Sequence, residues 1–302
     1  MLEITLTPRV NIEPYNVQMN ETSIDILKLL FEFRIATAGQ IARFLRQQDR
    51  VKYIYLKLHR MWQAGFLESF KVYTGSLAGI PVYYLLSKAG IKALADQAHY
   101  DKLQLKNYPA AKILLSSGSF KHEAQVVELA SLEALNKSDN LNITFKGEAG
   151  SQTREYRSDK NIEVLTPDYT VLYIVSNETE RVFTEFERTN KTNSAMIRKI
   201  ERYIRFFAIE ECKHATLRII FQTPGMETSF WLNILLDKPQ FLKHLRILTT
   251  QVSVLSSPAQ FLEPVYAAEN TVDLVRQGRV SATISSRLKL FSFLWWTLTS
   301  NF

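Results

Sequence analysis

The sequence predicts an α+β protein of two domains, and three observations lead to this prediction. Apolar residues recur at helical spacing in three segments between residues 21 and 64, and two runs of aromatic and β-branched residues follow them. From residue 119 onward, strand-like and helical segments alternate in a second block. The length of 302 residues and the composition, 46% hydrophobic and 22% charged, are typical of a globular chain with one or two cores.

The first domain is expected at residues 21–98, after an extended arm at 1–20 that shows no sustained periodicity. Its elements are bounded by capping residues and glycines. They are helices that begin near Ser23 and Thr37, a helix from about Asp49 to Gln63 that Gly65 ends, strands at 66–73 and 81–86, and a helix at 88–97 that Ser87 caps. Three helices, a hairpin and a helix, in this order, are typical of a winged helix-turn-helix domain.

The positive charge of the chain is concentrated in this first domain. The formal net charge of the whole chain is +7, and residues 23–97 hold eleven Lys and Arg against five Asp and Glu, a net charge of +6. A local basic excess creates a field that attracts polyanions. Nucleic acid is therefore the expected partner of this part of the chain.

The third predicted helix has one apolar and one polar side when its residues are placed at 100° intervals. The apolar arc, which we expect to face the core, contains Val51, Ile54, Tyr55, Leu58, Met61 and Trp62. Leu56 fits neither side. The polar side, with the residue before it and one residue of the hairpin, gives the predicted DNA contacts: Arg50, Lys52, Tyr53, Lys57, Arg60, Gln63 and Lys71. Such a face suits the major groove of double-stranded DNA, and an ordinary solvated helix face is the alternative.

The second domain is expected at residues 119–265, after a polar linker at 99–118, and a C-terminal tail follows at 266–302. The predicted order of its elements is αβββαβ. They are a helix from Phe120 to about Asn136, strands at 141–146, 169–175 and 182–187, a helix at 194–207 and a strand at 217–222, with a further helix near 230–236 and a strand at 245–249. The aromatic run in the tail favours a core or homodimer contact.

Acidic residues stand at the ends and on the faces of these elements. Glu123 lies near the start of the leading helix, Asp168 follows Pro167 at a strand entrance, and Glu185 and Glu187 share one face of the next strand. Neighbouring carboxylates need a cation, and a bound Mg²⁺ or Mn²⁺ would supply one and support phosphodiester hydrolysis. Ordinary ion pairs with Lys199, Lys191 or Arg188 are the alternative.

Asp168 after Pro167, with Glu185-x-Glu187 on the next strand, resembles the PD-(D/E)xK nuclease fold. The resemblance implies a metal held by Asp168 and Glu185, with Glu123 assisting. The family usually has Lys where this chain has Glu187, and Lys199 on the following helix is the candidate to replace it. The five residues named as candidate catalytic groups are thus Glu123, Asp168, Glu185, Glu187 and Lys199.

From about residue 23 to 265, the order of these motifs behind a winged helix more closely resembles the replication-relaxation family of plasmid and mobile-element proteins. The resemblance implies a DNA-binding accessory or regulatory role in replication, relaxation or mobilisation, with replication or relaxase proteins as further partners. Binding without cutting is the leading hypothesis. A metal-dependent endonuclease and a transcriptional repressor are the alternatives.

The remaining features concern location and cofactors. A single cysteine, the lack of a signal peptide and the lack of a 20-residue apolar run predict a cytoplasmic protein without a membrane segment. The pair Cys212 and His214 is too sparse for a zinc site, and there is no glycine-rich phosphate loop.

Overall fold

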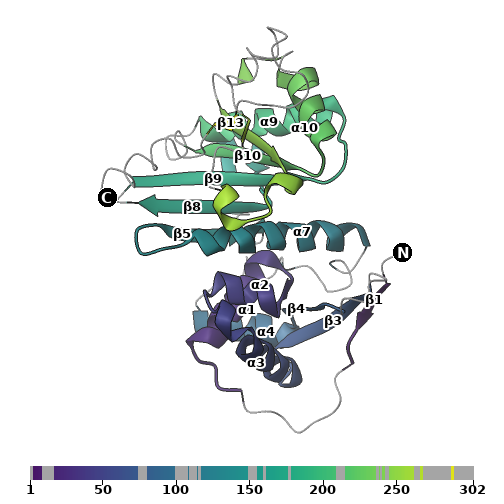
Figure 1. Cartoon of the computed structure of the whole chain (residues 1–302), viewed down its shortest axis with the longest axis vertical. Helices are drawn as coiled ribbons and strands as arrows, with labels where there is room; N and C mark the ends of the chain where they lie inside the picture. The colour runs from purple at the N-terminus through teal and green to yellow at the C-terminus, as the bar shows by residue number, and fades with distance from the viewer. Residues whose placement is uncertain are drawn as a thin grey trace. The chain divides into compact units, whose positions relative to one another are not determined.

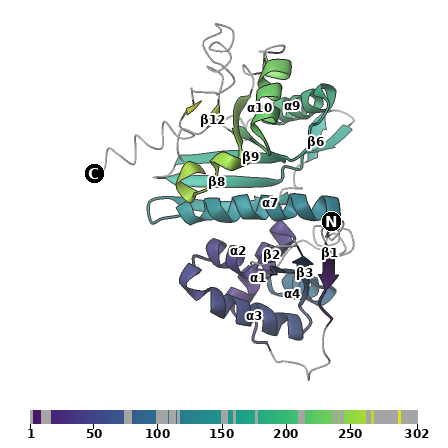
Figure 2. The same cartoon turned by 45° about the vertical axis from the view of Figure 1, so that its right-hand side comes forward.

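The structure is a computed structural model, and it divides into two compact units of mixed α and β structure (Figures 1 and 2). The first unit comprises residues 1–135 and 146–150, and the second comprises 136–145 and 151–302. The described residues are 3–8, 17–73, 80–98, 108, 114, 117–148, 155–158, 161–175, 178–208, 215–235, 238, 240–241, 245–261, 266–267 and 287–288.

The first unit combines helices with an antiparallel sheet in the strand order β1-β3-β4-β2. Its elements are β1 (Glu3–Leu6), α1 (Glu21–Phe33), β2 (Ala36–Thr37), α2 (Ala38–Phe44), the single turn η1 (Gln48–Arg50), α3 (Val51–Gln63), β3 (Leu67–Tyr73), β4 (Val82–Leu86), α4 (Lys88–Ala98) and α7 (Ser117–Glu133). The predicted helices and the hairpin of residues 21–98 are confirmed as secondary structure, with ends within a few residues of the expected ones.

Local signals in the sequence explain where these helices begin and end. Thr37 caps α2 through a capping box with Gln40, and Gly65 ends α3 in the left-handed conformation at φ 87°, as predicted. The prediction for α1 is wrong by three residues, because its N-cap is Asn20, whose Oδ1 accepts from the Ser23 amide at 3.1 Å. Ser87 Oγ accepts from the Gly90 amide at 3.1 Å at the start of α4.

Segments outside the predicted domain also belong to the first unit. Residues 3–6 of the expected arm form β1 and pair with β3. In the expected linker, the hydroxyl of the half-buried Tyr108 donates to the carbonyl of Arg34 at 2.9 Å, and Leu114 is buried. Helix α7, which we had expected to open the second domain, is grouped with the first unit. Arg43 of α2 binds Glu128 of α7 at 2.6 Å, which is one physical reason for this grouping.

The second unit is built on a sheet of seven strands in the order β13-β12-β11-β10-β9-β8-β5. Its strands are β5 (Asn142–Gly147), β8 (Tyr169–Val175), β9 (Glu178–Glu187), β10 (Thr216–Phe221), β11 (Arg246–Gln251), β12 (Tyr266–Ala267) and β13 (Arg287–Leu288). A separate hairpin, β6 (Glu155–Ser158) with β7 (Asn161–Val164), was not predicted. The helical elements are α9 (Asn193–Phe207), α10 (Pro224–Phe230), the π-helical turn η4 (Trp231–Leu235), η5 (Val252–Val254) and η6 (Pro258–Phe261). The short turn η2 (Ala134–Asn136) spans the boundary between the two units.

The direction of each strand in this sheet depends on the segment that connects it to the preceding strand. Strands β9, β10 and β11 are parallel, because α9 and α10 carry the chain back between them, whereas β8 and β9 form an antiparallel pair. The predicted strands at 169–175 and 182–187 and the helix at 194–207 are confirmed, although β9 begins four residues earlier than expected.

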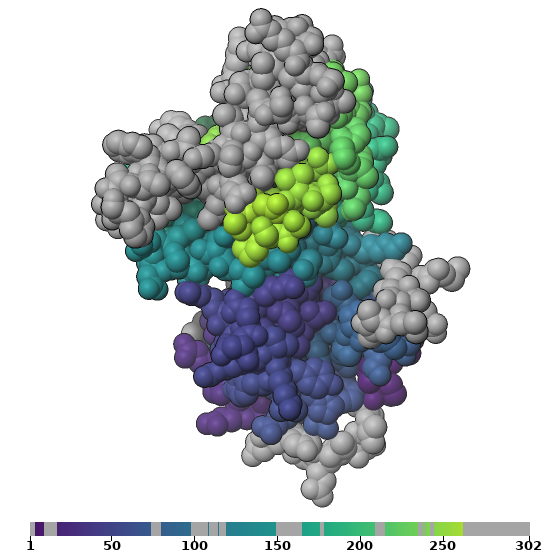
Figure 3. Space-filling model, in the orientation of Figure 1, coloured from purple at the N-terminus to yellow at the C-terminus, as the bar shows by residue number. Residues whose placement is uncertain are grey.

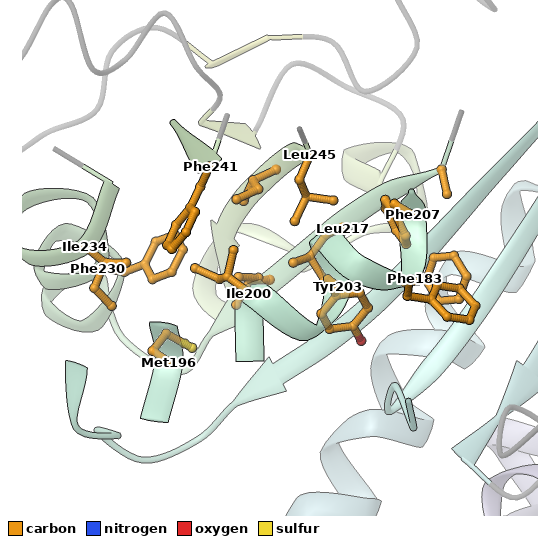
Figure 4. Packing of buried hydrophobic residues seen from close by; sticks show 14 of the residues in the cluster. Phe183, Met196, Ile200, Tyr203, Phe207, Leu217, Phe230, Ile234, Phe241 and Leu245 are labelled. Atoms are coloured by element: carbon orange, nitrogen blue, oxygen red, sulfur yellow. The ribbon is translucent and has the colours of Figure 1, made fainter. Parts of the chain in front are cut away.

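Helices α9 and α10 cover one face of the sheet and form the main core of the second unit (Figure 4). Tyr203 and Ile200 of α9 lie against Leu217 of β10 and Phe183 of β9 in that cluster. The opposite face buries Arg218, whose guanidinium donates to Thr184 Oγ1 at 2.8 Å and to the Tyr169 hydroxyl at 3.0 Å. Buried polar groups of this kind persist only when they are hydrogen-bonded.

Three predictions concern residues outside the described part of the chain. Most of the tail at 266–302, including its aromatic run, lies outside it, as do the tip of the hairpin at 74–79 and the pair Cys212 and His214. Among the helices that the structure describes, none is long and apolar enough to cross a membrane.

Candidate functional site

The first candidate surface is the outer side of α3, which lies at the surface of the first unit (Figure 3). Ile54, Leu58, Met61 and Trp62 are buried and hold the helix on the core. Of the predicted DNA contacts, Arg50, Lys52, Tyr53, Arg60 and Lys71 are exposed, and Lys57 and Gln63 are half-buried. The polar side of the helix therefore faces solvent in this unit.

The buried stripe of α3 is narrower than the sequence predicted. Val51 and Tyr55 were expected in the core, and both are exposed. Val51 is the first residue of the helix, and the ring of Tyr55 stacks along the helix surface on His59, with centroids 6.4 Å apart and an 11° interplanar angle. Leu56, which the sequence left unassigned, is also exposed.

Lys57 is held at the edge of this surface. Its Nζ donates to Asn20 Oδ1 at 2.7 Å, which links α3 to the N-cap of α1. Partial burial and the neighbouring guanidinium of Arg60 lower the pKa of Lys57. The two neighbouring cations repel each other, and a phosphate bound beside both of them would reduce this repulsion.

The second candidate site lies in the second unit, where α9 packs on β9. Glu185 and Glu187 point to the same face of β9, as their spacing predicted, and Lys199 of α9 lies between them. Lys199 Nζ is 2.6 Å from Glu185 Oε2 and 2.6 Å from Glu187 Oε1. Asp168, at the entrance of β8, accepts from the Phe186 amide at 2.6 Å. The structure therefore brings these four predicted residues together.

Two residues that were not among the predicted site residues complete this group. The Tyr203 hydroxyl donates to Glu185 Oε1 at 2.6 Å, and Lys191 Nζ lies 2.7 Å from Glu187 Oε2. Tyr203 lies four residues after Lys199 on α9, so helical periodicity was the signal that could have placed both on one face. We call Glu185, Glu187, Lys191, Lys199 and Tyr203 the Lys199 cluster.

Burial dominates the electrostatics of the Lys199 cluster. Glu185 and Glu187 are 5% and 1% exposed. Burial raises the pKa of Glu185, Lys199 opposes that shift, and the nearby Asp168 adds to it. Burial alone would lower the pKa of Lys199, but the two carboxylates raise it above its usual value. The ammonium of Lys199 thus offsets the repulsion between the two buried carboxylates.

Glu123, the fifth predicted catalytic residue, lies in the first unit. Its Oε1 accepts from Arg34 Nη1 at 2.8 Å, and the same guanidinium nitrogen lies 2.8 Å from Glu148 Oε2. Burial raises the pKa of Glu123, and Arg34 opposes that shift. Arg34 adopts φ 63° immediately after α1, and the sequence did not predict this backbone conformation.

The arrangement of the Lys199 cluster does not fit a metal ion. All four carboxylate oxygens of Glu185 and Glu187 accept from an ammonium or a hydroxyl of the protein. In the described part of the chain, no group of three or more His, Cys, Asp or Glu side chains is placed to hold a metal. A divalent cation would have to displace Lys199 first, because it needs the same oxygens.

An open cavity of about 220 Å³ adjoins the Lys199 cluster at the carboxyl ends of β9 and β10. Glu187 and Lys191 lie on its polar side, and Phe221 and Phe230 on its apolar side. The sequence did not predict this cavity, because α10 and the end of β10 meet α9 only in the folded unit.

The molecule is thus a two-unit α+β protein with an exposed basic helix in one unit and a buried lysine–carboxylate cluster in the other. A family model described as replication-relaxation matches residues 27–219, and the chain belongs to this family. Membership indicates a role in the replication or relaxation of plasmids or mobile elements.

Comparison with solved structures gives a match to the structure of restriction endonuclease FokI. The sequence identity is 11%, the match covers 86% of this chain and 45% of that chain, and the TM-score is 0.25. A likeness at this TM-score supports no argument about function. No protein of curated function matches the chain in sequence.

Proposed function

We propose that this protein is a DNA-binding accessory or regulatory protein of plasmid or mobile-element replication, relaxation or mobilisation, acting in the cytoplasm. In this proposal the first unit is a winged helix-turn-helix domain, and α3 enters the major groove of double-stranded DNA. The order α1, α2, α3, β3, β4 and α4 supports the domain assignment, because it places a hairpin directly after the third helix.

The observation that carries the proposal is the composition of the exposed side of α3. The helix has no acidic residue among its thirteen positions. Lys52 and Arg60 project from the side opposite its buried stripe, and the half-buried Lys57 lies at the edge of that side. Cations on one face of a helix neutralise phosphates and release counterions, which makes binding strong at low salt. Gln63 and Arg60 have side chains that can bond to base edges.

We propose that the second unit is nuclease-like in fold and supports binding without cutting. Asp168 at the entrance of β8 and the glutamates on β9 follow the order of the PD-(D/E)xK motif. Lys199 binds Glu185, one of the two carboxylates predicted to hold a metal, and it binds Glu187 at the same time. Replication or relaxase proteins, or a second copy of this chain, are the partners that this unit would recruit.

The first prediction removes two exposed cations from α3. We expect the double variant Lys52→Ala, Arg60→Ala to bind duplex DNA about tenfold more weakly or worse at about 0.1 M salt, since each lost phosphate contact lowers the affinity. The slope of log K against log salt should become shallower by about two. Fluorescence anisotropy titrations at several salt concentrations measure both quantities.

The matched control removes the same charge elsewhere in the same unit. Lys88→Ala, Lys92→Ala changes two exposed cations of α4 and should leave affinity and salt slope close to those of the wild type. Equal losses in the two double variants would mean that binding depends on net charge alone, and the placement of α3 in the groove would be wrong.

The endonuclease alternative has a direct test. Supercoiled plasmid incubated with the protein and Mg²⁺ or Mn²⁺ should stay intact, because Lys199 already occupies the carboxylates. Nicking that disappears in Asp168→Ala would establish the nuclease and overturn the non-cutting proposal. A bound site that overlaps a promoter would instead favour the transcriptional repressor.

A further inference from the structure

One exposed leucine occupies the middle of the cationic side of α3. Leu56 is 47% exposed, and at 100° per residue it projects almost directly opposite the buried stripe formed by Ile54, Leu58 and Met61. The periodicity of the sequence left Leu56 unassigned, and the structure places it at the centre of the face that we propose for DNA.

The neighbours of Leu56 are polar or cationic. Lys52 and Arg60 lie one turn to either side of it, and Tyr53, which is 46% exposed, lies three residues before it. An apolar side chain with a cation one turn before it and another one turn after it, on a helix without acidic residues, is complementary to a polyanionic surface that also presents apolar groups. A protein partner would have to place acidic residues around an apolar contact, and the basic charge of this unit favours the nucleic acid.

Double-stranded DNA presents such a combination in its major groove. The phosphates line both edges, and the C5-methyl of thymine is the apolar group displayed on the floor of the groove. Lysine and arginine at the edges of a helix reach the phosphates, while the residue at the centre of its exposed side approaches the bases. Leu56 is at that central position, and its side chain can offer only an apolar contact.

Building on the proposed function, we propose that Leu56 is a specificity-determining residue that recognises thymine through its C5-methyl group. The recognised site then contains a thymine at the position under Leu56. Removing one methyl from that contact should weaken binding about fourfold, the factor expected for one buried methyl group.

The test compares thymine with deoxyuridine, which differs only by the methyl group. Duplexes are first selected from a random-sequence pool with the full-length wild-type chain, and each thymine of the selected site is then replaced singly by deoxyuridine. We expect one position at which the replacement weakens wild-type binding about fourfold. We also expect Leu56→Ala to bind the thymine duplex about as weakly as the wild type binds the deoxyuridine duplex. The variant should bind the deoxyuridine duplex with the same affinity as the thymine duplex.

The controls separate this inference from the proposed function. Arg60→Ala should weaken binding to both duplexes equally and retain the fourfold discrimination, because Arg60 acts on another group. The role of Leu56 would be overturned if the wild type bound the thymine and deoxyuridine duplexes equally well at every position. It would also be overturned if Leu56→Ala still preferred the thymine duplex about fourfold. If the wild-type chain selects and binds no duplex at all, the proposed function fails as well.

Discussion

Replacing Lys199 by methionine is expected to lower the free energy of unfolding of the second unit by about 3–5 kcal/mol at neutral pH. The substitution keeps the length of the side chain and removes the ammonium that lies 2.6 Å from both Glu185 and Glu187. Two buried carboxylates would then face each other, with Lys191 as the remaining cation of the Lys199 cluster, and such a loss is costly. Urea denaturation followed by circular dichroism measures the change.

The matched control is Lys191→Met, which removes a second ammonium from the same carboxylate. The Lys191 side chain is 39% exposed, so solvent already screens its charge, and we expect a loss of less than about 1 kcal/mol. Comparable losses in both variants would show that Lys199 has no special place between the carboxylates, and the description of the Lys199 cluster would be wrong.

The effect of Lys199→Met should also depend on pH. Burial raises the pKa of Glu185 above 4.5, and Lys199 opposes this shift, so its removal raises the pKa further. A carboxyl whose pKa is raised by folding contributes stability at low pH and loses it as the pH rises through the folded pKa. The variant should therefore approach wild-type stability near pH 4 and fall increasingly below it toward pH 8.

A second measurement on Lys199→Met compares its melting temperature with and without divalent cations. With Lys199 gone, the oxygens that it occupied become available, and Mg²⁺ or Mn²⁺ should raise the melting temperature of Lys199→Met while leaving the wild type unchanged. A clear rise in the wild type would show that the carboxylates accept a metal despite Lys199, and it would restore the endonuclease hypothesis.

Replacing Arg34 by methionine is expected to cost about 3 kcal/mol of stability in the first unit. The guanidinium of Arg34 pairs with Glu123 and Glu148 at 2.8 Å each, and the Arg34 and Glu123 side chains are 13% and 8% exposed. Methionine leaves the backbone at φ 63° and removes the guanidinium with its charge and its hydrogen-bond donors, so the buried Glu123 carboxylate is left uncompensated. Thermal denaturation of the full chain measures the loss.

The companion variant Glu123→Gln distinguishes a structural from a metal-binding role of Glu123. A glutamine still accepts a hydrogen bond from Arg34 and carries no buried charge, so the loss of stability should be smaller than in Arg34→Met. In the double variant Arg34→Met, Glu123→Gln, part of the lost stability should return. If Glu123→Gln abolished a Mg²⁺-dependent activity at unchanged stability, Glu123 would instead belong to a catalytic site.

The sequence by itself determined the elements on which both candidate sites depend. Thr37 and Gly65 fixed the ends of α2 and α3 through local hydrogen bonds and a left-handed turn, which need no distant partner. The period of two along β9 placed Glu185 and Glu187 on one face, and the period of 3.6 along α3 separated most of its core residues from its cations.

Only the tertiary structure decided which partners these residues meet. Periodicity did not assign Leu56 to a side of α3. It did not decide between an ion pair with Lys199 and a bound metal for Glu185 and Glu187, and it did not show that Glu123 belongs to the first unit. These outcomes depend on contacts between residues far apart in the chain, such as Arg34 with Glu123 and Glu185 with Lys199. A charge pattern is local in sequence, whereas the burial and pairing that decide its chemistry arise when distant elements pack together.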